Sequence, residues 1–253
     1  MATQSCPRCG TDALPEYKFC LKCGAPLSSS DVDGAGNPTT SKARLILIKG
    51  EGGDTASYTL GGREHICGRT NGIVLFPDDE TVSPQHTNFF YQDGRLFLKD
   101  MGSLNGTYFR VTEPIFLREG DMFIAGEEVL IFHDGLGNVP QEKDEEGTTF
   151  FGTPTGGSYF ILQQVLSGGK PGAVYNARKT TVTIGRESCD FSFPDDRFMS
   201  HRHAAVEYKG DKVVLSDAGS RNGTFFRLRP GEEKALQDGD FLFIGRQLLR
   251  VSL

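Results

Sequence analysis

Two stretches of this sequence decide the fold. The first, at residues 68–110, reads GRTNGIVLFPDDETVSPQHTNFFYQDGRLFLKDMGSLNGTYFR. The second, at residues 185–227, reads GRESCDFSFPDDRFMSHRHAAVEYKGDKVVLSDAGSRNGTFFR. The two match without a gap at an offset of 117 residues, so Arg69 corresponds to Arg186 and Ser83 to Ser200. A register of this length indicates an internal duplication.

Both copies predict β-strands. Apolar and polar residues alternate in short runs, such as RLFLKD at 95–100 and KVVLSD at 212–217, and Gly, Asp, Asn or Pro bounds each run. No apolar stripe at helical spacing persists over three turns in either copy. The Gly-Asp turns at 120–121 and 239–240 are offset by 119, which indicates a two-residue insertion in the second copy. The sequence therefore predicts an all-β fold with two β-sandwiches in tandem.

Four of the six cysteines lie near the N-terminus as two C-x-x-C pairs: Cys6, Cys9, Cys20 and Cys23. Four thiolates complete a closed tetrahedral shell, which is the usual structural zinc site. Disulfides are the weaker interpretation because nothing in the sequence indicates export, and a redox C-x-x-C pair normally occurs singly. The segment is too short for an apolar core, so bound zinc would supply most of its folding free energy. We expect Cys67 and Cys189 to be core or turn residues.

These patterns predict five segments. We expect a zinc ribbon at 1–27, a flexible linker at 28–43, a sandwich at 44–133, an acidic linker at 134–157 and a sandwich at 158–253. The net charge of the 253-residue chain is −6, which argues against a generally basic nucleic-acid binder. No apolar run is long enough to span a membrane and no signal-peptide core is visible, so we expect a cytoplasmic protein without membrane contact.

The repeated polar residues cluster at turns, as G-R, S-x-x-H and G-S-x-N-G-T. Turns gather at the ends of a sandwich, so three such loops can converge. An arginine fork, a serine hydroxyl and an asparagine amide together suit a phosphate ester carried on a peptide. No G-x-S-x-G motif surrounds Ser83 or Ser200, so a serine hydrolase is not indicated. Only one histidine recurs in both copies, which is too few for a metal-dependent active site, so we expect that the protein is not an enzyme.

Both copies resemble forkhead-associated (FHA) domains, which are β-sandwiches that bind phosphothreonine. The signature G-R … S-x-x-H … N-G-T occurs twice, in order and at the spacing usual in that family, over about residues 44–133 and 158–253. The segment CPRCG…FCLKCG resembles small zinc-ribbon modules. The resemblance implies an adaptor or scaffold that binds phosphothreonine peptides in Ser/Thr kinase signalling. Its partners would be phosphothreonine-containing proteins, which could include a Ser/Thr kinase.

The resemblance also implies roles for single residues. The arginine grips the phosphate, the serine donates to it and the asparagine bonds the ligand backbone; these residues are Arg69, Ser83 and Asn105 in the first copy and Arg186, Ser200 and Asn222 in the second. The residues expected to support the loops are His86, His203, Gly106, Gly223, Thr107 and Thr224.

The two copies differ around these positions. The second copy has His201 and Arg202 after its serine and Arg221 before its asparagine, where the first copy has Pro84 and Leu104 at the two pocket positions. Residues 158–253 hold 14 Lys and Arg against 11 Asp and Glu, whereas residues 44–133 hold 8 against 13. The positive net charge of residues 158–253 favours binding of a doubly charged phosphate, whereas the negative net charge of residues 44–133 opposes it. We therefore expect the second domain to be the main phosphopeptide reader.

Three alternatives stay open. Thr148 and Thr149 lie among acidic residues in the second linker, so a kinase could modify them and supply an intramolecular ligand, or they are incidental residues of a spacer. The ribbon could contact nucleic acid, although its excess of one positive charge makes this partner unlikely. The sandwiches could also bind unphosphorylated partners as a scaffold.

Overall fold

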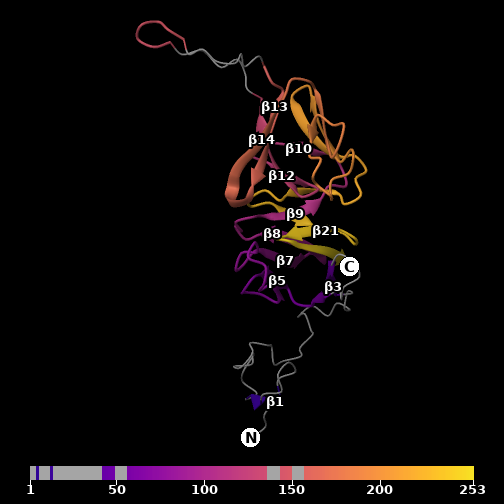
Figure 1. Cartoon of the computed structure of the whole chain (residues 1–253). Helices are drawn as coiled ribbons and strands as arrows, with labels where there is room; N and C mark the ends of the chain where they lie inside the picture. Colours follow the sequence, from indigo (N-terminus) through magenta and orange to yellow (C-terminus); the bar gives the residue numbers. More distant parts are fainter. Residues whose placement is uncertain (1–3, 6–11, 14–41, 49–55, 136–142, 150–156) are drawn as a thin grey trace. The chain divides into compact units, whose positions relative to one another are not determined.

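The structure, a computed structural model, describes residues 4–5, 12–13, 42–48, 56–135, 143–149 and 157–253 (Figure 1). The chain divides into two compact units, Met1–Thr40 and Ser41–Leu253. In the first unit β1 (Gln4–Ser5) pairs antiparallel with β2 (Asp12–Ala13). The four N-terminal cysteines lie outside the described residues. The described residues of the second unit form strands, turns and one short 3-10 segment, Ser167–Gly169, so the predicted all-β class is confirmed.

Within the described residues, each copy of the repeat supplies ten strands. Those of the first copy are β3 (Ala43–Ile48), β4 (Ser57–Leu60), β5 (Glu64–Gly68), β6 (Val74–Leu75), β7 (Thr87–Gln92), β8 (Arg95–Asp100), β9 (Thr107–Arg110), β10 (Ile115–Leu117), β11 (Met122–Ala125) and β12 (Glu128–Asp134). Those of the second copy are β13 (Phe160–Leu166), β14 (Lys170–Ala177), β15 (Thr181–Gly185), β16 (Phe191–Ser192), β17 (Ala204–Lys209), β18 (Lys212–Asp217), β19 (Thr224–Arg227), β20 (Glu233–Ala235), β21 (Phe241–Ile244) and β22 (Gln247–Ser252).

Local sequence explains why these strands form. In β8 the apolar residues Leu96 and Leu98 are buried while their neighbours are more exposed, as expected for a strand with one face on a core. The β7–β8 hairpin closes through Asp93 and Gly94, whose φ angles are +51° and +74°. An Asp-Gly pair with two positive φ angles matches the right-handed twist of the flanking strands, which fixes the register of the hairpin.

The sheets join strands from the two copies. A ten-stranded sheet has the order β14-β13-β12-β11-β19-β9-β21-β22-β3-β4. Two five-stranded sheets have the orders β20-β8-β7-β5-β6 and β10-β18-β17-β15-β16. Figure 1 accordingly shows β12 of the first copy beside β13 of the second, and β21 of the second copy beside β9 of the first.

The last three strands of each copy are therefore exchanged. The first sandwich combines β3–β9 with β20–β22, and the second sandwich combines β13–β19 with β10–β12. The two exchanges have the same register, since Ala125 lies opposite Thr224 and Ile244 opposite Thr107. Between the sandwiches β9 pairs antiparallel with β19, with Phe109 opposite Phe226. The chain passes from one sandwich to the other after β9 and after β19.

Two apolar cores follow the same exchange. In the first, Leu45 and Phe89 pack in one cluster with Leu242 and Leu249 from the second copy. In the second, the cluster contains Phe123 and Phe132 of the first copy with Phe160, Val206 and Leu215 of the second, among others. Burying these side chains supplies the main favourable contribution to folding, so each sandwich depends on strands from both copies.

The sequence predicts that residues 44–133 and residues 158–253 each form a complete sandwich, and the strand pairing corrects this division. Each sandwich takes its last three strands from the other copy. The physical reason is the duplication, because equivalent strands carry the same apolar pattern in the same register. Within the acidic linker, residues 143–149 form a small turn in which Lys143 bridges Thr149. No helix in the ranges that the structure describes has the length and apolar character needed to cross a membrane.

Candidate functional site

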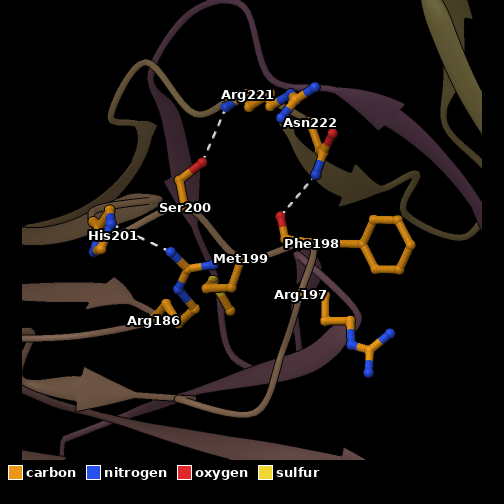
Figure 2. Close-up of a pocket in the computed structure, with 8 residues that line it drawn as sticks. All are labelled: Arg186, Arg197, Phe198, Met199, Ser200, His201, Arg221 and Asn222. Carbon is orange, nitrogen blue, oxygen red and sulfur yellow. Dashed lines mark hydrogen bonds between the residues drawn. The ribbon is translucent and has the colours of Figure 1, made fainter.

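Three loops of the second copy meet at one end of the second sandwich (Figure 2). Arg186 follows directly after β15, Ser200 and His201 precede β17, and Asn222 precedes β19. The Arg186 N–H donates to the Ser200 carbonyl at 2.9 Å and thereby ties the first loop to the second. A cavity of about 220 Å³ lies between these loops, and its lining residues are Arg186, Arg197, Phe198, Met199, Ser200, His201, Arg221 and Asn222.

Hydrogen bonds orient the serine and the asparagine of this site. The Ser200 Oγ accepts the Arg221 backbone N–H at 3.0 Å, so its hydroxyl proton is left to donate to a ligand. The Asn222 Nδ2 donates to the Phe198 carbonyl at 2.8 Å. Figure 2 shows both bonds as dashed lines between residues that line the cavity. The two side chains are therefore held in fixed positions before any ligand binds.

The Arg186 guanidinium contacts His201 and Glu187. Its Nη2 lies 3.2 Å from the His201 Nε2, and its Nε lies 3.6 Å from the Glu187 Oε1. That Nε is buried and makes no hydrogen bond, and the Nε of Arg69 in the first copy has the same property. A buried donor without a hydrogen bond has a free-energy cost, which an anionic ligand could offset. The Nε of each arginine is thus left without a hydrogen bond within the protein.

A buried histidine connects the loops beneath the site. The Ser200 N–H donates to the Nδ1 of His203 at 3.1 Å, so the ring proton must lie on Nε2, which donates to the Gly223 carbonyl at 3.1 Å. His86 makes the same two bonds, with Ser83 and Gly106, at 3.1 and 3.0 Å. Burial lowers the pKa of both rings below the ordinary 6.5, partly opposed by the bonds to the glycine carbonyls.

An aspartate that the sequence motifs did not predict organises the turn that contains Asn222. The Asp217 carboxylate accepts hydrogen bonds from the Ser220 N–H, the Ser220 hydroxyl and the Thr224 hydroxyl at 2.6 to 3.0 Å. These bonds lower the pKa of Asp217 against the opposing effect of burial. Asp100 bonds Ser103 and Thr107 in the first copy in the same way. The offset of 117 residues was the signal that could have found both aspartates.

The first copy carries the same framework in the first sandwich. The Arg69 N–H donates to the Ser83 carbonyl at 2.9 Å, and the Leu104 N–H donates to the Ser83 Oγ at 3.1 Å. The Asn105 Nδ2 donates to the Thr81 carbonyl at 2.8 Å. The surroundings differ, because Leu104 is 84% exposed and offers no charge at the position of Arg221. The structure thus brings all three predicted residues together in each copy.

Some charged residues of the second site were predicted and others were not. His201 and Arg221 line the cavity as expected, whereas Arg202 is exposed and is absent from the lining. Arg197 and Phe198 line it without having been predicted, and Phe198 is 53% exposed. Their counterparts in the first copy are Glu80 and Thr81. The sequence signal that could have found them is that the two copies differ at these two positions, directly after the FPDD that they share.

The exchange of strands changes the charge argument. Residues 158–227 hold 10 Lys and Arg and 7 Asp and Glu, and residues 115–134 add 1 and 5, so this part of the second sandwich has a net charge of −1. The excess of three positive charges in residues 158–253 therefore does not describe the second sandwich. A preference for phosphate must come from the side chains around the cavity, three of which are the arginines Arg186, Arg197 and Arg221.

The remaining candidates lie elsewhere. Cys67 is buried in the first core, and burial raises the pKa of its thiol to about 12, so it is an unreactive core residue. Thr148 is exposed in the small turn of the acidic linker, where its N–H donates to the Asp144 carboxylate at 2.7 Å. Among the described residues, no group of three or more His, Cys, Asp or Glu is placed to hold a metal.

Comparisons with known proteins identify the family of the chain. The family model of the FHA domain matches residues 59–126 and 182–245, and that of a zinc-ribbon domain matches residues 5–27. The two FHA matches cover more than half of the chain. The chain therefore belongs to the FHA-domain family, with two FHA domains in tandem and an N-terminal zinc ribbon.

Individual relatives share part of the chain. The oxoglutarate dehydrogenase inhibitor of Corynebacterium jeikeium is 30% identical over 95 residues, which is 38% of this chain and 64% of the relative. The glycogen accumulation regulator GarA of Mycobacterium tuberculosis is 30% identical over 141 residues, 54% of this chain and 82% of GarA. A solved structure from a study of phosphothreonine-dependent FHA domain interactions is 31% identical, with a TM-score of 0.24 over 37% of this chain and 95% of that chain.

Proposed function

We propose that the protein is a non-enzymatic adaptor that binds phosphothreonine peptides in Ser/Thr kinase signalling, and that the site of the second copy is the main reader. The observation that carries this proposal is the cavity in which Arg186, Ser200 and Asn222 converge with three further basic side chains. Arginine forks and hydroxyl donors suit a phosphate ester, and the fixed asparagine amide suits a peptide backbone. Membership of the FHA family supports the same function.

The proposal gives each of these residues a role. Arg186 would bind the phosphate through its guanidinium, and Ser200 would donate its hydroxyl proton. The His201 Nε2, which accepts from the Arg186 Nη2 at 3.2 Å, would orient that guanidinium. Arg221 would attract the phosphate or a neighbouring acidic residue. Arg69, Ser83 and Asn105 offer the same framework with Pro84 and Leu104 beside it, so we expect weaker binding at the first site.

We further propose that the ribbon holds one structural zinc ion through Cys6, Cys9, Cys20 and Cys23. The match of residues 5–27 to a zinc-ribbon family and the donor set of four thiols support this proposal. The ribbon would add a second surface for protein partners. The partners we expect are phosphothreonine-containing proteins, including a Ser/Thr kinase, in the cytoplasm.

The acidic turn around Thr148 and Thr149 is a candidate kinase substrate. Thr148 is exposed and its neighbours Asp144, Glu145 and Glu146 are exposed as well, so a kinase can reach the segment. A phosphate there would be an intramolecular ligand at an effective concentration on the order of millimolar. Mapping the sites after incubation with a kinase tests this, and the proposal fails if neither threonine is modified.

Binding of a degenerate phosphothreonine peptide pool to the full chain tests the main proposal. Fluorescence anisotropy should detect binding of the phosphorylated pool and none of the same pool without phosphate. Arg186→Ala should weaken binding by about tenfold or more, because a hydrogen bond to a charged group contributes about 1.5–3 kcal/mol. Arg69→Ala is the matched control and should change the affinity by less than about twofold. Equal binding of both pools would establish a phosphate-independent scaffold instead.

A further inference from the structure

Each phosphopeptide site rests on a turn from the other copy of the repeat. At the second site, the Asp196 Oδ1 accepts the backbone N–H groups of Phe198 and Met199 at 2.7 and 3.1 Å. Both residues line the cavity, and Phe198 also accepts the bond from Asn222. The carboxylate therefore sets the path of the backbone along one side of the site.

The second oxygen of the same carboxylate binds the first copy. The Asp196 Oδ2 accepts the Glu127 N–H at 2.7 Å, in the turn between β11 and β12. Gly126 in that turn has a φ of +64°, and a Cβ there would overlap the Asp196 carboxylate. Asp196 is only 5% exposed, so this bond is shielded from water. The turn of the first copy thus holds the residue that shapes the second site.

The first site is built in the same way from the second copy. The Asp79 Oδ1 accepts the Thr81 N–H at 3.0 Å, and its Oδ2 accepts the Arg246 N–H at 2.9 Å and the Gln247 Nε2–H at 2.7 Å. Gly245, the counterpart of Gly126, has a φ of +59°, and a Cβ there would lie 2.6 Å from the Thr81 Oγ1. The same contact therefore occurs in both copies of the repeat and is a regular feature of the fold.

From this arrangement we infer that the β11–β12 turn of the first copy is a positioning element of the second phosphopeptide site, acting through Asp196. The first copy is thereby required for ligand binding at the second site whether or not it binds phosphate itself. This inference rests on the proposed function, because its main test measures the binding of a phosphothreonine peptide. It assigns Glu127, Gly126 and Asp196 as positioning residues, because none of them lines the cavity.

A pair of glycine variants in the full chain tests the inference. Gly126→Ala should lower the affinity of the second site for the phosphothreonine peptide pool by about tenfold, because the Cβ displaces Asp196 and the backbone it holds. Gly245→Ala makes the same change in the turn at the first site and should alter that affinity by less than about twofold. The measurements use the Arg69→Ala background, so that only the second site is read. The opposite ranking, or equal effects of the two variants, would overturn the inference.

A disulfide cross-link tests the strand exchange on which the inference depends. It requires no peptide ligand, and it does not depend on whether a glycine variant folds. Ile131 in β12 lies opposite Gln163 in β13, whereas its counterpart Arg250 lies opposite Ile46. Oxidation should therefore link Ile131→Cys to Gln163→Cys and leave Ile131→Cys unlinked to Ile46→Cys, as read by mass spectrometry of the linked peptides. A link to position 46 instead would refute the exchange. If the exchange holds but no phosphopeptide binds to the unmodified chain, the proposed function has failed on its own.

Discussion

The two sites differ most at single residues that carry or lack a donor. Pro84 has no N–H and no polar side chain where the second copy has His201, and Leu104 stands exposed where the second copy has Arg221. The double variant Pro84→His and Leu104→Arg should strengthen phosphopeptide binding at the first site by about fivefold, since each added donor can bond the phosphate. Anisotropy titration in an Arg186→Ala background measures it. An unchanged affinity would mean that Glu80 and the rest of the loop dominate.

Acid sensitivity is a second property of single residues. Burial lowers the pKa of His65, His86 and His203 below 6.5, the ordinary value that the unfolded chain retains. Between these pKa values the unfolded chain binds more protons, so the stability that the neutral rings provide is complete above about pH 6.5. It is lost as the pH falls through their folded-state pKa values. We therefore expect the Tm to decrease as the pH is lowered from 7.5 to 5.

Two variants check that assignment by thermal unfolding. His203→Gln should lower the Tm at pH 7.5, because it removes the bonds to Ser200 and Gly223, and should reduce the further fall at pH 5. His201→Gln, at a side chain that is 72% exposed, should leave both values nearly unchanged. A pH dependence in His203→Gln as steep as in the unmodified chain would show that this ring is not its source.

Among the elements, the crossing segment after β19 carries an ion pair specific to the exchange. The Arg229 guanidinium donates to both oxygens of Asp121 in the turn before β11, at 2.9 and 2.7 Å, and Asp121 is 8% exposed. Asp121→Asn should destabilise the protein by roughly 2 kcal/mol, because it removes the buried one of the two carboxylates that pair with Arg229 and leaves only the more exposed Glu232, at 3.5 Å. Asp240→Asn, the equivalent change in the second copy, should cost less than about 0.5 kcal/mol. Chemical denaturation compares them, and the reverse ranking would place Arg229 beside Asp240.

The sequence predicted individual strands and loops but not which strands pair with each other. The alternation in RLFLKD and KVVLSD predicted β8 and β18, and the repeated loops predicted that Arg186, Ser200 and Asn222 meet. The partner of each C-terminal hairpin was not predictable. Because β11 and β21 carry equivalent patterns, either fits β9 or β19 in the same register, so local patterning does not distinguish the two pairings. Only contacts between unlike residues, such as Arg229 with Asp121, can favour one of them.

For the whole molecule, the exchange makes unfolding of one sandwich inseparable from unfolding of the other. Each apolar core contains strands from both copies, and the ten-stranded sheet runs through both sandwiches. Losing the first sandwich releases β20–β22, and with them the constraint on β19, which pairs with β9 and β11. Residues 41–253 should therefore unfold in one cooperative transition.

Calorimetry of the full chain measures this cooperativity. The main transition should have equal calorimetric and van't Hoff enthalpies and a heat-capacity change of roughly 2.6 to 3.2 kcal/mol/K, as expected for the 213 residues from 41 to 253 unfolding together. Leu249→Ala, in β22, removes apolar contact from the first core and should shift the entire transition downward by roughly 2–5 kcal/mol of stability. Two resolved transitions, of which only one moves in this variant, would instead require sandwiches that fold independently. A phosphothreonine peptide bound at the second site should likewise raise the whole transition, because a ligand stabilises every part of a cooperative unit.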